Sequence, residues 1–337
     1  MPTQKHKILF VFLSFVLIGT FLLNLSLGSV SIPTIEIFNS IIGKEIKPSW
    51  EIILWNFRLP KAITAILVGM GLSISGLLMQ TLFRNPLAGP YVLGLSSGSS
   101  LGVAFVIMGA GFLPSFLVSD YGIVLASSLG SFLVLLAVLV VSQKLRDTMA
   151  ILIVGLMFGS FTSAIVSVLS YFSTAQELQK FTFWSMGSLA NLPWNSILIL
   201  AICCGLGLVL SIFSIKPLNA LLLGENYAKS LGLNFRRTRL IIIFATSILA
   251  GSITAFAGPI AFVGLAVPHL AKLLFQTSNH FILFWSTLLI GAILMLICDS
   301  IAQLPGSDYT LPINAITSMV GAPVVVWLLV RKRKIMI

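Results

Sequence analysis

Residues 281–302 read FILFWSTLLIGAILMLICDSIA, and only one of these side chains, that of Asp299, is charged. A helix needs about 20 predominantly apolar residues to cross the hydrocarbon core of a bilayer. The stretch meets this requirement, and its one acid lies close to its end. It therefore predicts a transmembrane helix.

The same pattern recurs along the chain. Nine further apolar segments are candidates for spanning helices: residues 8–28, 59–81, 91–110, 119–142, 149–171, 195–214, 239–257, 259–275 and 311–330. The segment 259–275 is the weakest of them, because it is short and contains Pro259 and Pro268, and it could be re-entrant instead. We expect an all-α polytopic membrane protein with about ten transmembrane helices.

The composition excludes most other classes of protein. Hydrophobic residues make up 58% of the 337-residue chain and charged residues only 9%, compared with about 25% charged residues in an ordinary soluble domain. A soluble enzyme, a disordered regulator and a disulfide-stapled secreted domain do not carry so much apolar surface. Cys203, Cys204 and Cys298 lie in apolar runs without metal-ligand spacing, and we interpret them as packing residues.

The basic residues indicate the orientation of the chain. With the N-terminus in the cytoplasm and ten spans, 15 of the 20 basic residues fall inside, and the other five fall outside: Lys44, Lys47, Arg58, Lys61 and Lys180. Cytoplasmic loops carry an excess of Lys and Arg, so we expect both termini in the cytoplasm. The net charge of +11 then reflects membrane orientation, and no nucleic-acid partner is expected.

Besides the outer connection 172–194, two long connections lie outside the spans and carry patterns of their own. The outer-face segment 29–58 contains a short apolar stretch after Pro33, which could form a helix lying along the membrane interface. The cytoplasmic loop 215–238 is the second long connection, and its pattern is more specific.

The cytoplasmic loop contains two predicted short helices. Residues 218–223 form an apolar stretch that Gly224 interrupts, and residues 225–231 follow, with Glu225 in their first turn and Gly232 just past their end. An early acid and a final glycine are typical helix start and stop signals. The apolar faces of these helices could dock a partner or pack under the bundle, and the pattern leaves both alternatives open.

The sequence lacks motifs for catalysis and for energy conversion. No glycine-rich phosphate loop ends in Gly-Lys-Ser/Thr, and the three histidines show no metal-ligand spacing. We interpret Asp299 as a solvated helix-end acid, with a functional acid as the alternative. We expect no catalytic residue and no bound metal, so the protein must be a passive path or take its energy from a partner.

Several motifs occur in a fixed order along the chain. The two longest are LGENYAKSLG at 223–232 and AGPIAFVGLAVPH at 257–269. The others are RLPK at 58–61, SGLLMQ at 75–80, RNPLA at 84–88, LGLSSG at 93–98, WSMGS at 184–188 and GAP at 321–323. In this combination the chain resembles the FecCD-type permease family of ABC importers for iron chelates, haem and vitamin B12, from about residue 58 to residue 330.

The resemblance implies that this chain forms the transport path and that separate subunits hydrolyse ATP and deliver the substrate. It implies one permease domain over residues 1–337 with the ten-span bundle of type II importers, in the bacterial cytoplasmic membrane. A second permease subunit, two cytoplasmic ATPases and an extracytoplasmic substrate-binding protein are its expected partners, with a homodimer favoured. The ATPases use ATP and magnesium, and this chain binds no cofactor. The residues that match the ATPase-coupling element are Leu223, Gly224, Glu225, Ala228, Leu231 and Gly232.

The resemblance also places gates and a docking site. The family's cytoplasmic gate falls on Asn85 and Leu87 and on Thr148 and Met149. The contact with the binding protein falls on two outer cations, Arg58 and Lys61. The family often has Arg where Lys61 stands and a basic residue where Gln303 stands, so docking is expected to depend less on ion pairs.

The cargo expected from the resemblance is a ferric siderophore or a related metal chelate, with haem and cobalamin as alternatives. Two other functions would leave different marks on the sequence. An ion-coupled secondary transporter predicts charged residues deep in the spans or paired broken helices. An intramembrane enzyme predicts paired acids or histidines at one membrane face, and the sequence shows none.

Overall fold

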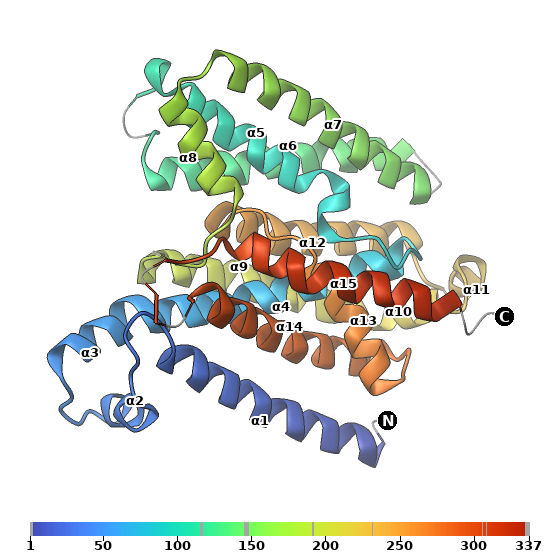
Figure 1. Cartoon of the computed structure of the whole chain (residues 1–337). Coiled ribbons are helices and arrows are strands. Elements are labelled where there is room, and N and C mark those ends of the chain that lie inside the picture. Colours follow the sequence, from blue (N-terminus) through green and yellow to red (C-terminus); the bar gives the residue numbers. More distant parts are fainter. Residues whose placement is uncertain are drawn as a thin grey trace. The chain divides into compact units, whose positions relative to one another are not determined.

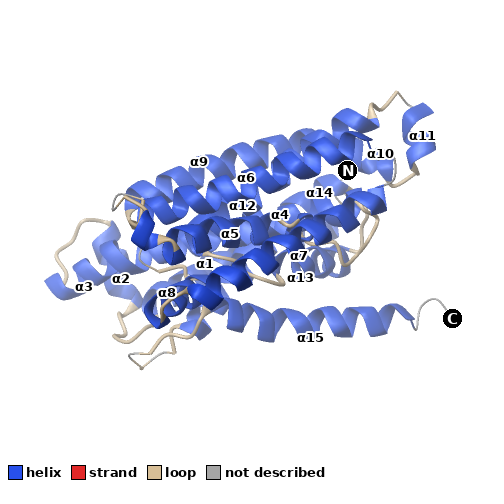
Figure 2. Cartoon of the chain, turned by 90° about the horizontal axis from the view of Figure 1, so that it is seen from above, coloured by secondary structure: helices blue, strands red, loops and turns tan. Residues whose placement is uncertain are grey.

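The computed structural model describes residues 3–114, 117–144, 148–190, 192–230, 232–304, 306–307 and 309–333. Across these residues Figure 2 shows helices and loops, so the predicted all-α fold is confirmed. In chain order the elements are α1 (Gln4–Ser26), α2 (Thr34–Ile41), α3 (Pro48–Ile53), the π-helical turn η1 (Leu54–Arg58), α4 (Leu59–Leu82), η2 (Pro90–Leu93), α5 (Leu95–Met108), η3 (Ala110–Phe112), α6 (Asp120–Lys144), α7 (Thr148–Phe172), α8 (Ala175–Ser185), α9 (Trp194–Phe213), α10 (Ile215–Leu221), α11 (Glu225–Ser230), α12 (Phe235–Ala257), α13 (Val263–Phe275), α14 (His280–Ala302) and α15 (Ile313–Arg333).

Each of the ten predicted apolar segments coincides with an apolar helix. Seven helices in the described residues are long and apolar enough to cross a membrane: Gln4–Ser26, Pro48–Leu82, Tyr121–Val138, Ile153–Phe172, Trp194–Phe213, Phe235–Ala257 and His280–Ala302. The other three segments correspond to shorter apolar helices, Leu95–Met108, Val263–Phe275 and Ile313–Trp327. The polytopic prediction is confirmed, and the count of ten crossings and the side of the termini stay predictions.

The weakest segment, 259–275, is helical over only part of its length. Its helix begins at Val263 after Phe262, whose backbone is left-handed (φ 65°), and contains the buried Pro268. Thirteen residues rise only about 20 Å, which is less than the roughly 30 Å of a hydrocarbon core. The helix α13 is therefore too short to cross a bilayer alone.

The chain forms two compact units. Unit 1 contains Met1–Ser73, Ser188–Ile202 and Ala261–Ile337, and unit 2 contains Ile74–Gly187 and Cys203–Ile260. Two of the four boundaries between the units fall inside α4 and α9, and the other two fall in the connections from α8 to α9 and from α12 to α13. The expectation of one permease domain stays a prediction.

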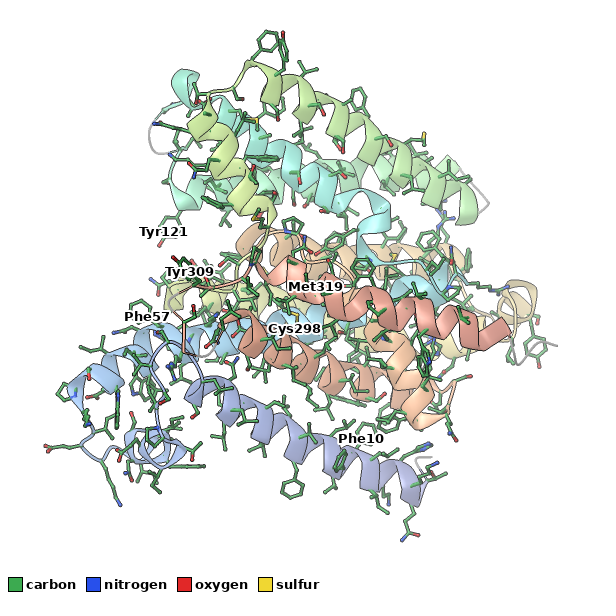
Figure 3. The ribbon with its side chains drawn as sticks, viewed as in Figure 1. Phe10, Phe57, Tyr121, Cys298, Tyr309 and Met319 are labelled. Carbon is green, nitrogen blue, oxygen red and sulfur yellow. The ribbon has the colours of Figure 1, made fainter. Side chains whose placement is uncertain are left out.

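In unit 1, α1 runs alongside α14 (Figure 1). Leu13, Phe275, Ile282 and Ile293 form a buried apolar cluster, and the rings of Phe10 and Phe275 lie 4.8 Å apart (Figure 3). The opposite side of α1 is apolar and exposed, with large side chains at Phe12, Phe15 and Ile18 among others. A helix that is apolar on its free side is suited to lipid and not to water.

In unit 2, α5 and α6 pack backbone against backbone. A Cβ atom at Gly102 would collide with the carbonyl oxygen of Ala126, and Gly98 and Gly130 are in equally close contact with each other. Ser131 Oγ donates to the carbonyl oxygen of Leu95 at 3.1 Å, which adds a polar contact between the two helices. Gly98 and Gly102, four residues apart on α5, thus lie at the contact with α6, as small residues do in membrane bundles.

We expect Gly102→Ala to destabilise the chain by about 1–3 kcal/mol, because the added methyl group has no room between α5 and α6. The matched control is Gly205→Ala on α9, where a Cβ atom has open space and helix propensity should raise stability by up to about 1 kcal/mol. Thermal unfolding of both variants in detergent measures the difference. Equal midpoints for the two variants would contradict the close packing.

Candidate functional site

The cytoplasmic loop folds into the two predicted short helices. The helix α10 begins at Ile215, before the predicted start, and α11 begins at Glu225 as predicted and ends at Ser230. Leu231, the remaining predicted residue of this helix, lies outside the described residues. Gly224 separates the helices with a left-handed backbone (φ 109°), and Gly232 follows with a φ of 84°, conformations that glycine adopts without strain.

The loop has a buried face and an exposed face. Ile215, Leu218 and Leu221 of α10 are buried, and so is Ala228 of α11. Leu222 follows α10 and is exposed, so it does not share the buried face of Leu218 and Leu221.

Three large apolar side chains of the loop are exposed. Leu222, Leu223 and Tyr227 have 51%, 63% and 55% of their surfaces exposed, and we name these three residues the loop patch. The buried face agrees with the alternative in which the loop packs under the bundle. The loop patch is not covered by this packing and is accessible to a partner. Grouped apolar side chains outside a protein core are typical of an interaction site.

The turn after α4 carries two of the predicted gate residues. The Asn85 side-chain oxygen accepts a hydrogen bond from the backbone N–H of Leu87 at 2.9 Å, which fixes the turn locally. The Leu87 side chain is exposed. The other predicted gate residues, Thr148 and Met149, are the first two residues of α7. The role of all four in a gate stays a prediction.

The turn and the loop are connected inside unit 2. Arg84 Nη2 donates a hydrogen bond of 3.1 Å to the carbonyl oxygen of Leu221, the last residue of α10. A cation at the C-terminus of a helix also interacts favourably with the free carbonyl groups there. Sequence reasoning had assigned no role to Arg84, although it opens the RNPLA motif.

The predicted docking residue Arg58 is buried, with 7% of its surface exposed. Its Nη1 donates to the carbonyl oxygens of Leu25 at 2.5 Å and Ser26 at 2.9 Å, and its Nη2 donates to the carbonyl oxygen of Val30. The guanidinium thus binds the carbonyl groups at the end of α1, which have no partner within the helix. Arg58 has a structural role in this chain.

The second predicted docking residue, Lys61, forms an ion pair. Its Nζ lies 3.0 Å from Asp299 Oδ1, and Asp299 is only 1% exposed. Asp299 Oδ2 also accepts hydrogen bonds from Asn24 Nδ2 at 2.9 Å and Gln303 Nε2 at 2.8 Å. We name these four residues the polar cluster; it joins α1, α4 and α14 and the residue after α14.

The interpretation of Asp299 as a solvated helix-end acid is therefore wrong. Its carboxylate is buried and held by a counter-charge and two amide donors, as a carboxylate removed from water requires. Because Arg58 and Lys61 are both engaged internally, the structure gives no support to their role in docking, which stays a prediction.

The described residues contain no group of three or more His, Cys, Asp or Glu side chains arranged to hold a metal ion. The three cysteines are free thiols, and Cys204 and Cys298 are buried (Figure 3 labels Cys298). The burial of Cys204 and Cys298 agrees with the interpretation of these two cysteines as packing residues.

The sequence matches known transport proteins over nearly its whole length. Residues 16–331 match the FecCD transport family. The chain is 34% identical over 326 residues to the vitamin B12 import system permease protein BtuC of Klebsiella pneumoniae, covering 95% of this chain and 93% of that protein. It is 32% identical over 331 residues to the hemin transport system permease protein HmuU of Yersinia pestis, covering 98% and 97%.

Two solved structures are similar in fold. An inward-facing structure assigned as a metal-chelate type ABC transporter has a TM-score of 0.85 and 32% identity, covering 96% of this chain and 99% of that one. PsaBC from Streptococcus pneumoniae in complex with a Fab has a TM-score of 0.56 and 14% identity, covering 82% and 92%, and this likeness concerns the fold alone. The chain therefore belongs to the FecCD transport family and is a membrane-embedded permease of the ABC importer class.

Proposed function

We propose that this chain forms, with a second copy of itself, the path for a ferric siderophore or a related metal chelate across the bacterial cytoplasmic membrane. The similarity to a metal-chelate type transporter over 96% of the chain supports this class of cargo. Relatives are named for vitamin B12 and hemin, so cobalamin and haem are the alternative cargoes.

The observation that carries the proposal is the loop patch. Leu222, Leu223 and Tyr227 are exposed on a loop whose other face is already packed. We propose that a separate ATPase subunit covers this patch. The loop patch and a set of neighbouring residues then form the element that transmits the movement of the ATPase to the permease: Gly224, Glu225, Ala228, Leu231 and Gly232. Closure of two ATPases on ATP would then move two permease subunits as rigid bodies.

The cytoplasmic gate is proposed to lie at the turn of Asn85 and Leu87 and at the start of α7, with Thr148 and Met149. Small polar and apolar side chains that meet at a two-fold axis can separate without breaking an ion pair. Such a wall gives a bulky chelate no strong charge to bind, which favours its release.

A substrate-binding protein is proposed to deliver the chelate on the other side of the membrane. If Arg58 and Lys61 contact it, they must first leave the carbonyl groups at the end of α1 and the carboxylate of Asp299. The internal contacts make a docking surface based on these two cations costly to form.

The function can be tested by transport into vesicles. We expect a radiolabelled ferric siderophore to accumulate only when this permease is reconstituted with its ATPase and its substrate-binding protein, and only with ATP. Radiolabelled haem and cobalamin in parallel vesicles identify the cargo. Uptake driven by an ion gradient without any ATPase would show a secondary transporter and overturn the proposal.

A further inference from the structure

The helix α2 has three distinct faces. At 100° per residue, Ile37 and Ser40 share one face, and both are buried. Glu36 and Asn39 follow on a partly exposed polar face. The third face is apolar and exposed: Ile35, Phe38, Ile41 and the cap residue Ile42. We name these four residues the α2 apolar face.

The α2 apolar face is held outward by contacts on the other side of the helix. Trp55 Nε1 donates to Ser40 Oγ at 3.0 Å, and Ser26 Oγ donates to the carbonyl oxygen of Ile32, just before α2, at 2.7 Å. Ile37 is fully buried and α2 contacts α1. Because the buried face is fixed, rotation of α2 cannot bring the apolar face into the protein.

The surroundings of α2 resemble a membrane–water interface. Three tryptophans lie close to α2 in the chain or at the start of α9: Trp50, Trp55 and Trp194. Trp194 Nε1 donates a hydrogen bond of 3.2 Å to the carbonyl oxygen of Trp55. Lys47 Nζ lies 4.5 Å from the centre of the third ring, that of Trp50. Tryptophan is enriched where the headgroups meet the acyl chains.

The exposed apolar surface continues from α2 into the spans. Ile52 and Phe57 are exposed just before α4 (Figure 3 labels Phe57). The helix α2 lies at the C-terminal end of α1 (Figure 1), and the free side of α1 is apolar. Lipid covers that side of α1 in a membrane. The lipid that covers α1 can therefore also cover the α2 apolar face.

The charges around α2 indicate how this helix would contact a membrane. Between residues 29 and 57 there are two cations, Lys44 and Lys47, and three acids, Glu36, Glu45 and Glu51. A net charge of 2 − 3 = −1 gives no attraction to anionic headgroups. Contact between α2 and a membrane must therefore depend on insertion of apolar side chains among the acyl chains.

We propose that α2 lies in the membrane plane at the C-terminal end of α1, with Ile35, Phe38, Ile41 and Ile42 in the acyl chains. Glu36 and Asn39 face the water, and Ile37 faces the protein. The helix then anchors the connection between α1 and α4 to a zwitterionic membrane surface. This inference requires only that the chain lies in a membrane, whichever cargo it carries.

The test uses the full chain with Cys203, Cys204 and Cys298 replaced by serine, provided that this parent inserts into membranes and keeps its thermal midpoint. Phe38→Cys and Asn39→Cys each receive a nitroxide label, so that neighbouring residues report on two faces of one helix. The variants are reconstituted in phosphatidylcholine vesicles and, separately, in vesicles that also contain phosphatidylglycerol. Collision of the label with oxygen reports lipid, and collision with a water-soluble nickel chelate reports water.

We expect the label at Phe38 to collide with oxygen several-fold more than with the nickel chelate, the label at Asn39 to show the reverse, and phosphatidylglycerol to change neither. If Phe38→Cys does not fold, Ile35→Cys reports on the same face. Nickel access at both positions would place the helix in water and overturn the proposal. Poor access of both reagents to Phe38 would mean that a protein surface, such as a second copy, covers the face, and would equally overturn it.

Discussion

Replacing Asp299 by asparagine should lower the free energy of unfolding by about 3–5 kcal/mol. The substitution keeps the shape of the side chain and removes its charge, so the Lys61 ammonium stays largely buried without a counter-charge. The amide groups of Asn24 and Gln303 would also face a weaker acceptor. Thermal unfolding in detergent, compared with the unaltered chain, measures the loss.

The matched control replaces both members of the ion pair. In the Lys61→Met/Asp299→Leu chain the charged pair is absent, and apolar replacement of a buried pair is often neutral or stabilising. We expect this double variant to recover most of the stability that Asp299→Asn loses. An Asp299→Asn chain as stable as the unaltered one would show that the pair is not buried as described.

Placing a charge on the loop patch should abolish association with the ATPase. A glutamate at Leu223 or Tyr227 would have to lose its water in an apolar contact, which costs several kcal/mol without a partner. We therefore expect Leu223→Glu to weaken co-purification of the ATPase by about 100-fold or more. ATP-dependent uptake into vesicles should be lost in the same variant.

The control for the loop patch is Ser278→Glu. Ser278 is exposed in the connection between α13 and α14, on the predicted cytoplasmic side, so the variant adds the same charge outside the patch. Both variants should insert and unfold at the temperature of the unaltered chain, because neither side chain is buried. Normal ATPase association of Leu223→Glu would refute the coupling assignment.

Hydropathy predicted the long apolar helices, because the transfer of a segment into lipid depends on the composition of that segment alone. The two short helices of the loop were also predictable, since Gly224 and Gly232 interrupt helices through their own backbone preference. The start of α10 was missed because only Ser214 separates it from α9, and no glycine or proline marks the end of α9.

The partners of the buried charges were not predictable in the same way. Asp299 lies near the end of its span, and hydropathy cannot distinguish an acid in water from one paired with Lys61 on another helix. Arg58 was assigned to the outer surface for the same reason, although the free carbonyl groups at the end of α1 lie within its reach. Asn24, a polar residue in an otherwise apolar segment, was the available sign that a buried partner exists.

The hydrogen bond between Arg84 and Leu221 has a mechanical consequence. A bond of 3.1 Å weakens once its length increases by a few tenths of an ångström. The end of α10 and the Arg84 guanidinium must therefore shift together, or the bond breaks. A displacement of the short helices would therefore reach the turn that carries Leu87 through the Arg84 guanidinium group.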